Sequence, residues 1–356
     1  AYKTGSTKLM QVLMVLFIIT ALFNAVLLLS SNGSEYNMWI NPINIGLIGG
    51  AMLFGFGMSF SGCCASGVMT NLLTDIPRGA TTLFFFSFGV YLGYPLKATQ
   101  SWISDSVIST PQSNGVFLPD LFPFTSSINI LSAFVITVFF AIIIIFFARK
   151  YEQKRKDRGD YSGVANELAY KNNKSYWTNK MSANVVVRFY KWLMLSPWSM
   201  VTSALFIAII FAAMLITTNN GWGASGVFGL WFGKILIAIG ISVEQVAQFA
   251  NKPISAFTRS ALLHPISLQN IGIMFGALIC ALLMGKLQWK TNYSFKQIAL
   301  FALGGLLMGL GTRLASGCNV GALYTPIANF SLSGWIFLMC LILGGIAGNR
   351  VAVRLN

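Results

Sequence analysis

Charged residues are scarce in this chain, and that scarcity excludes most soluble proteins. Asp, Glu, Lys and Arg make up 9% of the 356 residues, whereas 55% of the residues are apolar. A water-soluble domain usually carries about 25% charged residues. Apolar runs long enough to cross the roughly 30 Å of a bilayer core recur along the chain. The clearest are Leu9–Ser30, Ile128–Ala148, Met200–Ile216, Leu268–Gly285 and Ser333–Gly348. The sequence therefore predicts an all-α, polytopic transmembrane helical bundle in contact with membrane lipid.

Histidine is almost absent, since His264 is the only one. This excludes a histidine-based zinc cluster, a Ser-His-Asp triad and a pair of haem ligands. We expect no metal, no cofactor and no catalytic residue, and thus not an enzyme. The five cysteines are an odd number set in apolar sequence, which is not the pattern of a disulfide framework. Any cysteine chemistry would therefore involve thiols.

Basic residues are concentrated in one polar segment. Eleven basic and four acidic residues lie between Arg149 and Lys191, so this segment carries +7 of the net charge of +15. Nucleic-acid binding is one explanation, but cytoplasmic loops of membrane proteins are ordinarily rich in Lys and Arg. We therefore expect no nucleic-acid partner and predict a first transmembrane repeat at residues 1–148, a cytoplasmic linker at 149–191 and a second repeat at 192–356.

The other loops can be sorted by the same rule. Ser31–Asn41 has no Lys or Arg, and Lys97–Ser127 has one Lys against Asp105 and Asp120. Both are predicted to be external. Gly285–Lys296, with three lysines, and the C-terminus, with Arg350 and Arg354, are predicted to be cytoplasmic. Leu9–Ser30 is not followed by a small-residue cleavage site, so we expect a membrane helix there and not a signal peptide.

An internal repeat is the most informative feature. Gly50–Gly67 aligns without a gap on Gly304–Gly321, at an offset of 254 residues, and six of the 18 positions are identical. Four of these identities are glycines and one pairs Cys64 with Cys318. The first copy lies between two predicted external loops and the second between two cytoplasmic ones. The copies are therefore predicted to be inverted repeats, an arrangement that recurs in transporters.

Each copy also contains a predicted helix break. Residues 62–67 and 316–321 are rich in Gly, Ser and Cys and are poor continuous helix, and Pro77 and Pro326 follow. We expect each copy to run as a helix, a small-residue turn and a partly re-entrant half-helix. The unpaired N–H groups at the start of a half-helix suit an anion.

Cys64 and Cys318 occupy equivalent points at these breaks. A single buried cysteine usually packs like a small apolar residue, but the same residue in both halves, beside Gly and Ser, favours a function. A thiol is a weak donor with a soft, polarizable sulfur, which suits a sulfur-bearing solute. Cys63 stands opposite Gly317 and is expected to be dispensable, and Cys280 and Cys340 are interpreted as packing residues. The predicted substrate-binding set is Cys64, Cys318, Gly62, Ser66, Gly67, Gly317, Asn319, Gly321 and Arg313.

Arg313 lies inside the repeat, where an arginine is costly unless it faces a cavity or a partner. It could attract an anion toward the second break, or it could extend to the cytoplasmic edge beside Lys296. Asp75 and Arg78 are expected to pair or to cap the far end of the first half-helix. Glu244 could couple transport to protons or simply lie on a surface turn.

The segments GFGMSFSGCCASG and GLGTRLASGCNVGALYTPIANFSLSGW resemble the YeeE/YedE family of bacterial inner-membrane transporters of sulfur compounds. The resemblance implies an hourglass-like helical fold in the cell inner membrane and uptake of thiosulfate or a related sulfur anion, passed along by hydrogen bonds from Cys64 and Cys318. Family members usually carry an earlier helix whose Arg-x-Arg-Phe-Cys-like motif supplies a third cysteine. The sequence opens at Ala1 without that motif, and we expect the motif to lie upstream of Ala1.

Two other functions remain open at this point. In a membrane sulfurtransferase, Cys64 or Cys318 would form a persulfide and pass sulfur to a cytoplasmic carrier protein. That chemistry needs a base or a lowered thiol pKa, and the sequence places neither His nor Lys beside the cysteines. A purely structural membrane subunit would leave the repeated cysteines unexplained.

Overall fold

The computed structural model describes residues 4–30, 36–110, 114–163, 190, 198–284 and 292–355. Among these residues, regular structure is helical, apart from two isolated β-bridges. Seven helical segments of the described chain are long and apolar enough to cross a membrane. Four of the five apolar runs named from the sequence lie within such helices, and Leu268–Gly285 overlaps the helix Pro265–Leu283, which confirms the prediction of an all-α, polytopic bundle.

The chain divides into two compact units. The first comprises Ala1–Tyr36, Phe124–Asn219 and Leu282–Lys286, and the second comprises Asn37–Pro123, Asn220–Ala281 and Leu287–Asn356. Each unit contains its own set of packed helices. The division of the chain at the linker 149–191 stays a prediction, because residues 164–189 and 191 lie outside the described part. The described start of that linker is helical.

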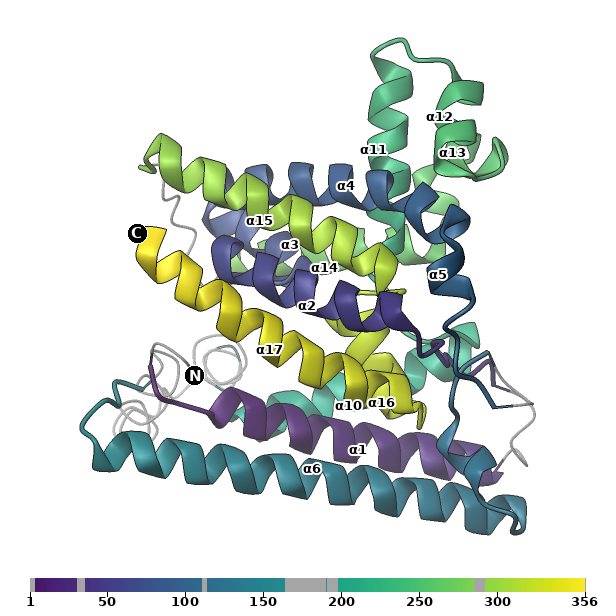
Figure 1. Ribbon diagram of the computed structural model, residues 1–356, viewed down its shortest axis with the longest axis vertical. Coiled ribbons are helices and arrows are strands. Elements are labelled where there is room, and N and C mark those ends of the chain that lie inside the picture. The colour runs from purple at the N-terminus through teal and green to yellow at the C-terminus, as the bar shows by residue number, and fades with distance from the viewer. Residues whose placement is uncertain are drawn as a thin grey trace. The chain divides into compact units, whose positions relative to one another are not determined.

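The first unit is built on three long helices. Helix α1 (Lys8–Ser30) packs against both α6 (Ser126–Asp157) and α10 (Met200–Thr218); Figure 1 shows α1 alongside α6. The start of α1 is held by a buried carboxylate, since Glu152 accepts hydrogen bonds from the backbone N–H and the hydroxyl of Thr7, at 3.0 and 2.8 Å. Lys156 lies 2.8 Å from the same carboxylate and balances its charge.

The second unit contains a layer of four helices in the order α4, α15, α2 and α17 (Figure 1). Their bounds are α4 Ile76–Thr99, α15 Phe295–Leu314, α2 Ile45–Ser61 and α17 Leu332–Leu355. Close approach of the two central helices depends on glycine. A Cβ atom added to Gly50 would lie 2.7 Å from the carbonyl oxygen of Gly311, and one added to Gly57 would lie 2.7 Å from that of Gly304. Helices α2 and α15 are therefore antiparallel and pack backbone against backbone.

These contacts show the symmetry that the sequence repeat predicts. Gly50 and Gly57 correspond to Gly304 and Gly311 at the offset of 254, and each glycine meets the counterpart of the other. The offset of 254 residues places helix α3 (Ala65–Thr74) on residues 319–328. In the structure these residues form the π-helical turn η4 (Asn319–Tyr324) and the short helix α16 (Thr325–Ala328). Helices α2, α3 and α4 thus correspond to α15, η4 with α16, and α17, and the predicted inversion of the two copies is confirmed.

The remaining elements of the second unit lie around this layer. Helix α11 (Gly226–Ala238) packs on α4, and α12 (Val243–Ala250), α13 (Ser255–Thr258) and the short turn η3 (Ala261–Leu263) lead to α14 (Pro265–Leu283). The connection after α4 contains α5 (Ser101–Ser104) and η1 (Leu118–Leu121). An isolated bridge joins Ile108 to Ile43, just before α2, and another joins Phe117 to Ser331, just before α17.

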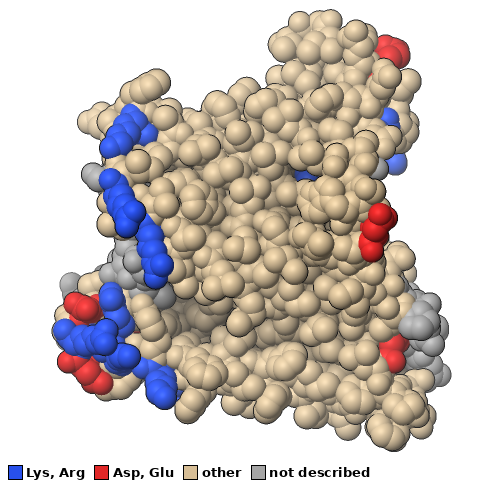
Figure 2. All heavy atoms as spheres, in the orientation of Figure 1, with Lys and Arg blue, Asp and Glu red and all other residues tan. Residues whose placement is uncertain are grey.

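Basic and acidic side chains are unevenly placed on the second unit. In Figure 2, Lys and Arg atoms gather at the end where α15 begins and α17 ends, where Lys296, Arg350 and Arg354 are found. Acidic atoms appear at the opposite end, together with a smaller group of basic ones. Both bridges tie the predicted external loop Lys97–Ser127 to this second end, at Ile43 and at Ser331.

Candidate functional site

The first helix break lies where the sequence predicts it. Helix α2 ends at Ser61, and Gly62 adopts a left-handed conformation with φ of 64°, donating its N–H to the carbonyl of Met58 at 2.8 Å. A residue with positive φ is the usual way to stop a helix, and glycine adopts that conformation at the lowest cost. Cys64 is extended and begins α3. Its Sγ accepts the N–H of Gly67 at 3.4 Å and lies 3.2 Å from the hydroxyl of Ser66.

The second break repeats this backbone with different residues. Helix α15 ends at Leu314, Ser316 has φ of 61°, and the extended residue Cys318 begins the next helical turn. Ser316 corresponds to Gly62 and Cys318 to Cys64 at the offset of 254. The segment after Cys318 is a π-helical turn and not the plain half-helix that the sequence predicts. Each thiol therefore stands at the N-cap position, directly before a helical segment that follows a left-handed turn.

The residue between the left-handed turn and the thiol differs between the two copies for a steric reason. A Cβ atom on Gly317 would lie 2.7 Å from the backbone nitrogen of Ala322, so the tight π-helical turn excludes a side chain there. The open first turn tolerates Cys63, whose half-buried side chain lies near Ser61, Asn71 and Arg78.

Arg78 holds the first turn in place, a role that the sequence does not predict. Its Nε donates to the carbonyl of Ser61 at 2.7 Å, and a Cβ atom on Gly62 would lie 2.1 Å from its Nη2. Its guanidinium also lies over the ring of Phe301 at 5.7 Å and 4.0 Å from Asp75. The expected pair of Asp75 and Arg78 is therefore present, but Arg78 reaches back to the break instead of capping the far end of α3.

Tyr293 completes this cluster by donating a hydrogen bond to the carboxylate of Asp75. Burial, together with the hydrogen bond and the negative charge of Asp75, raises the pKa of Tyr293 to about 12. The phenol therefore stays protonated across the physiological range. Asp75 links α3, α4 and the start of α15 through Arg78 and Tyr293.

The second turn is held by residues from distant segments. Asn41 donates its side-chain amide to the carbonyl of Gly321 at 3.0 Å, and Trp39 donates to the side-chain oxygen of Asn41 at 3.0 Å. Thr325 donates to the carbonyl of Trp222 at 2.6 Å. Sequence analysis misses Asn41 and Trp222 because they lie outside the repeat.

The two turns lie at opposite ends of the crossing between α2 and α15. A Cβ atom on Gly304 would lie 2.8 Å from the nitrogen of Ser61, and one on Gly50 would lie 2.5 Å from the nitrogen of Ala315. Ser61 and Ala315 are thus separated by eleven helical residues, about 16 Å along the axis. The chain after Cys318 turns back toward the C-terminal end of α2, because the side-chain nitrogen of Asn319 lies 3.7 Å from the sulfur of Met58, three residues before that end.

The half-helices meet between these ends, since α3 contacts η4. Cys318 is buried, Cys64 is half-buried, and the side-chain oxygen of Asn319 is buried without a hydrogen-bond partner among the described residues. The structure thus gathers Cys64, Ser66 and Gly67 at one turn, and Gly317, Cys318, Asn319 and Gly321 at the other. Of the two cysteines interpreted as packing residues, Cys340 is half-buried but Cys280 is exposed on α14, so Cys280 does not pack in the interior of its unit as expected.

Arg313 lies in the last turn of α15, and its side chain faces α4 and the start of α11. One of its terminal nitrogens donates to the hydroxyl of Ser225 at 3.1 Å, and its guanidinium lies 5.6 Å from the ring centre of Tyr94. It is at the opposite end of α15 from Lys296. The alternative in which Arg313 extends to the edge beside Lys296 is therefore wrong.

Comparison with known proteins identifies the family. Residues 1–347 match the family model described as sulphur transport. The chain belongs to this family. The resemblance to YeeE/YedE proteins is thereby confirmed, and the chain is a multi-pass membrane protein with the two thiol-bearing turns described above.

Two named relatives give a finer comparison. The probable transporter YedE of Escherichia coli strain K12 is 30% identical over 148 residues, which cover 40% of this chain and 36% of YedE. The thiosulfate transporter TsuA of Spirochaeta thermophila is 24% identical over 320 residues, 86% of this chain and 78% of TsuA. The match therefore spans about a third of the length of YedE but most of the length of TsuA.

Proposed function

We propose that this protein takes up thiosulfate, or a closely related sulfur-containing anion, across the bacterial inner membrane through a narrow passage lined by Cys64 and Cys318. The observation that carries the proposal is the pair of matched turns, each of which ends a long helix and presents a thiol at the start of the next helical segment. The similarity to TsuA over most of the chain supports the choice of substrate class.

The chemistry of the thiols fits a soft anion. A neutral S–H group can donate a weak hydrogen bond to the terminal sulfur or an oxygen of thiosulfate, and its own sulfur is polarizable. Conduction needs binding strong enough to admit the ion and weak enough to release it. Fixed cations at these two points would hold a dianion more tightly than neutral thiols do. In this proposal the thiols act only through hydrogen bonds and polarizable contacts, so no bond to sulfur is made or broken.

The positions of the turns suit two successive contacts. The helix ends that precede the two turns, Ser61 and Ala315, lie about 16 Å apart along the crossing helices. In this proposal the two thiols contact the anion one after the other. The N–H of Gly67 already points at the sulfur of Cys64, and the start of α3 carries the partial positive charge of a helix N-terminus. That charge would offset part of the loss of water around the dianion.

The orientation follows from the charged ends of the second unit. Lys296, Arg350 and Arg354 belong to the end where α15 begins and α17 ends, which the positive-inside rule assigns to the cytoplasm. The other end, with Asp105 and Asp120, would face outward. The passage would then run from the outer end of the α2–α15 crossing to the cytoplasmic end.

This function is tested in a bacterium that lacks sulfate uptake. The measurement is its growth with thiosulfate as the only sulfur source. The unaltered protein should restore growth, and Cys64→Ala and Cys318→Ala should not, at equal amounts of protein in the membrane. Cys280→Ala is the matched control, since Cys280 is exposed on α14, and should restore growth fully. Restored growth with both turn variants would overturn the proposal. A persulfide on Cys64 or Cys318, detected by mass spectrometry in thiosulfate-grown cells, would instead support the sulfurtransferase.

A further inference from the structure

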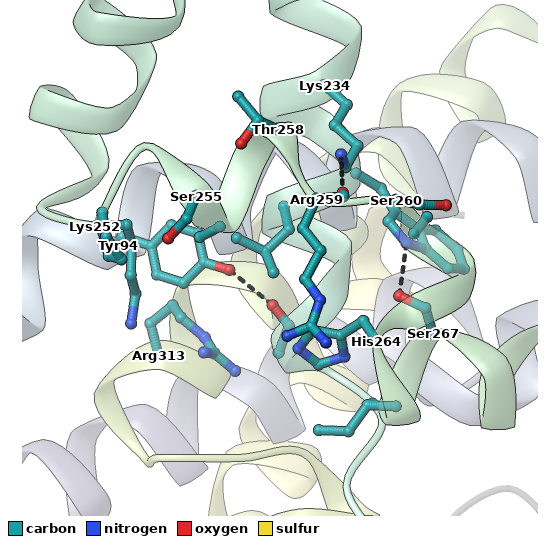
Figure 3. Close-up of a pocket in the computed structure, with 17 residues that line it drawn as sticks. Tyr94, Lys234, Lys252, Ser255, Thr258, Arg259, Ser260, His264, Ser267 and Arg313 are labelled. Carbon is teal, nitrogen blue, oxygen red and sulfur yellow. Dashed lines mark hydrogen bonds between the residues drawn. The ribbon is translucent and has the colours of Figure 1, made fainter.

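A second cluster of candidate anion ligands lies in a pocket of the second unit. It is an open pocket of about 700 Å³, lined by the ends of α4 and α15, one face of α11, the segment after α12 and the start of α14. None of the described residues that line it is Asp or Glu. Its walls carry four basic side chains, shown with their neighbours in Figure 3: Lys234, Lys252, Arg259 and Arg313.

Lys234 fixes the shape of the pocket. Its ammonium donates to the carbonyls of Phe257 at 2.5 Å and Arg259 at 2.6 Å. These bonds tie α11 to the backbone of Phe257 and Arg259, from which the Arg259 side chain extends. Lys234 therefore acts as a positioning residue, while the other cations keep donors for a ligand.

Lys252 and Arg313 share one aromatic ring. The ammonium of Lys252 lies 5.5 Å and the guanidinium of Arg313 lies 5.6 Å from the ring centre of Tyr94, whose hydroxyl donates to the carbonyl of Gly226. A ring can offset only part of two positive charges. No carboxylate lies within 4.0 Å of either cation among the described residues, and Nε of Arg313 is buried without a partner there.

Arg259 and His264 approach the same space from the other side. In Figure 3 the guanidinium groups of Arg259 and Arg313 extend into the pocket from opposite walls, with the His264 ring beside Arg259. Nδ1 of His264 is buried and has no hydrogen-bond partner among the described residues. Cations on several walls, together with unpartnered nitrogens, form a site that an anion with several acceptor oxygens would complete.

We propose that this pocket binds a doubly charged tetrahedral oxyanion, with Lys252, Arg259 and Arg313 as its charged ligands and His264 as a hydrogen-bonding group. Guanidinium groups bind such anions through paired N–H donors. Sulfate, thiosulfate and a phosphate group share this chemistry. The site adjoins the second thiol-bearing turn, because Arg313 lies in the last turn of α15. Lys252, Arg259 and His264 come from the segment between α12 and α14.

The position of the pocket suits the capture of the substrate before uptake. This inference rests on the proposed function. Tyr94 and Arg313 belong to the end of the four-helix layer opposite Lys296, the end assigned to the outside. An anion captured here would be concentrated at the outer side before it reaches the thiols. Cationic clefts raise the local concentration of an anionic substrate in this way.

Isothermal titration calorimetry tests the site by measuring the affinity of the purified full chain for thiosulfate, sulfate and inorganic phosphate. Lys252→Gln and Arg259→Gln remove exposed charges, so both variants should fold. Together they should weaken binding about tenfold or more, as expected when charged hydrogen bonds are lost. Lys296→Gln makes the same charge change at the other end of α15 and should leave the affinity within about twofold. Equal affinities in the double variant and the unaltered protein would overturn the proposal.

A second experiment shows whether the ligand of the pocket is a free anion or the headgroup of a lipid. Native mass spectrometry in the presence of phosphatidic acid should show whether a phospholipid occupies the pocket and whether thiosulfate displaces it. Loss of bound lipid in the double variant would support the same site with a headgroup phosphate as its ligand. Lipid retained equally by the double variant lies elsewhere and argues against the pocket as the lipid site.

Transport measurements distinguish this site from the proposed function. The double variant should raise KM for thiosulfate with little change in maximal rate, whereas Cys64→Ala should lower the rate and leave calorimetric binding at the pocket unchanged. If the cysteine variants transport normally, the thiol passage fails while the binding site can still be measured. An unchanged KM in the double variant would contradict the capture role.

Discussion

At the residue scale, Gly62 shows how a single missing side chain sets up the site. Its positive φ stops α2, and its lack of Cβ leaves room for the guanidinium of Arg78. Either requirement alone would favour glycine. Its counterpart Ser316 also has a positive φ but carries a side chain, so a Cβ atom fits at the second turn and not at the first.

Gly62→Ala should therefore be costly. The new methyl group would force Arg78 off the carbonyl of Ser61, and the backbone would be strained, so we expect a loss of roughly 1–3 kcal/mol in unfolding free energy. Gly49→Ala, on the same helix with nothing within 4 Å of its Cβ, should be neutral or slightly stabilising. Thermal unfolding of the two purified variants provides the comparison, and equal melting temperatures would show that the clash is relieved without cost.

His264 gives the pocket a pH dependence. Burial, and then the positive charge of Arg259, lower its pKa below the ordinary 6.5, so the ring is neutral at pH 7. A bound dianion would favour the imidazolium and raise this pKa. Affinity should therefore rise as pH falls from the pKa of the complex to that of the free protein. The other titratable side chains that line the pocket are Tyr94, Lys234, Lys252, Arg259 and Arg313.

The measurement is calorimetric titration with sulfate from pH 7.5 to about 5. His264→Gln keeps a hydrogen-bonding side chain but cannot become charged, so its affinity should change little over that range. A rise of the same size in His264→Gln would assign the pH dependence to another group.

At the element scale, the antiparallel crossing of α2 and α15 positions both turns. Its four glycines let the backbones touch, and each turn begins where one of these helices ends. Any side chain larger than hydrogen on this face must push the helices apart. The turns would then lose their alignment even though the thiols are unchanged.

Gly57→Val and Gly311→Val should have similar effects because the two positions are equivalent. Each added side chain meets carbonyl and nitrogen atoms of the partner helix at about the same distance, and overpacking of this kind costs typically 1–3 kcal/mol. Gly276→Val, on α14 with open space at its Cβ, is the matched control. Melting temperatures in detergent give the comparison, and a large difference between the first two variants would contradict the symmetric crossing.

Much of this arrangement could be predicted from the sequence. Gly, Ser and Cys at equal spacing in two copies indicate the breaks, and the loop charges indicate that the copies are inverted. The contact of Arg78 with the first turn, and that of Asn41 with Gly321, could not be predicted, because they join residues far apart in the chain with no periodic pattern. The pocket is missed for the same reason: it combines α4, α11, the segment before α14 and the end of α15.

At the scale of the whole molecule, the proposed topology assigns the two ends of the second unit to opposite sides of the membrane. Single cysteines placed at Lys296 and Asp105, in a variant without the native cysteines, should react with an impermeant maleimide from the inside and the outside respectively. The bridge between Ile43 and Ile108 places Asp105 near the start of α2, and Lys296 lies at the start of α15. Labelling of both positions from the same side would contradict the assignment.

The central claim is that two thiols, one from each inverted copy, carry a sulfur-containing anion through the membrane. Initial rates of radiolabelled thiosulfate uptake into liposomes that contain the purified protein test it most directly. Cys64→Ala and Cys318→Ala should each lower the rate about tenfold or more, the equivalent of one or two lost hydrogen bonds, while Cys280→Ala keeps the rate of the unaltered protein. Undiminished uptake by the variant that lacks both Cys64 and Cys318 would contradict the account.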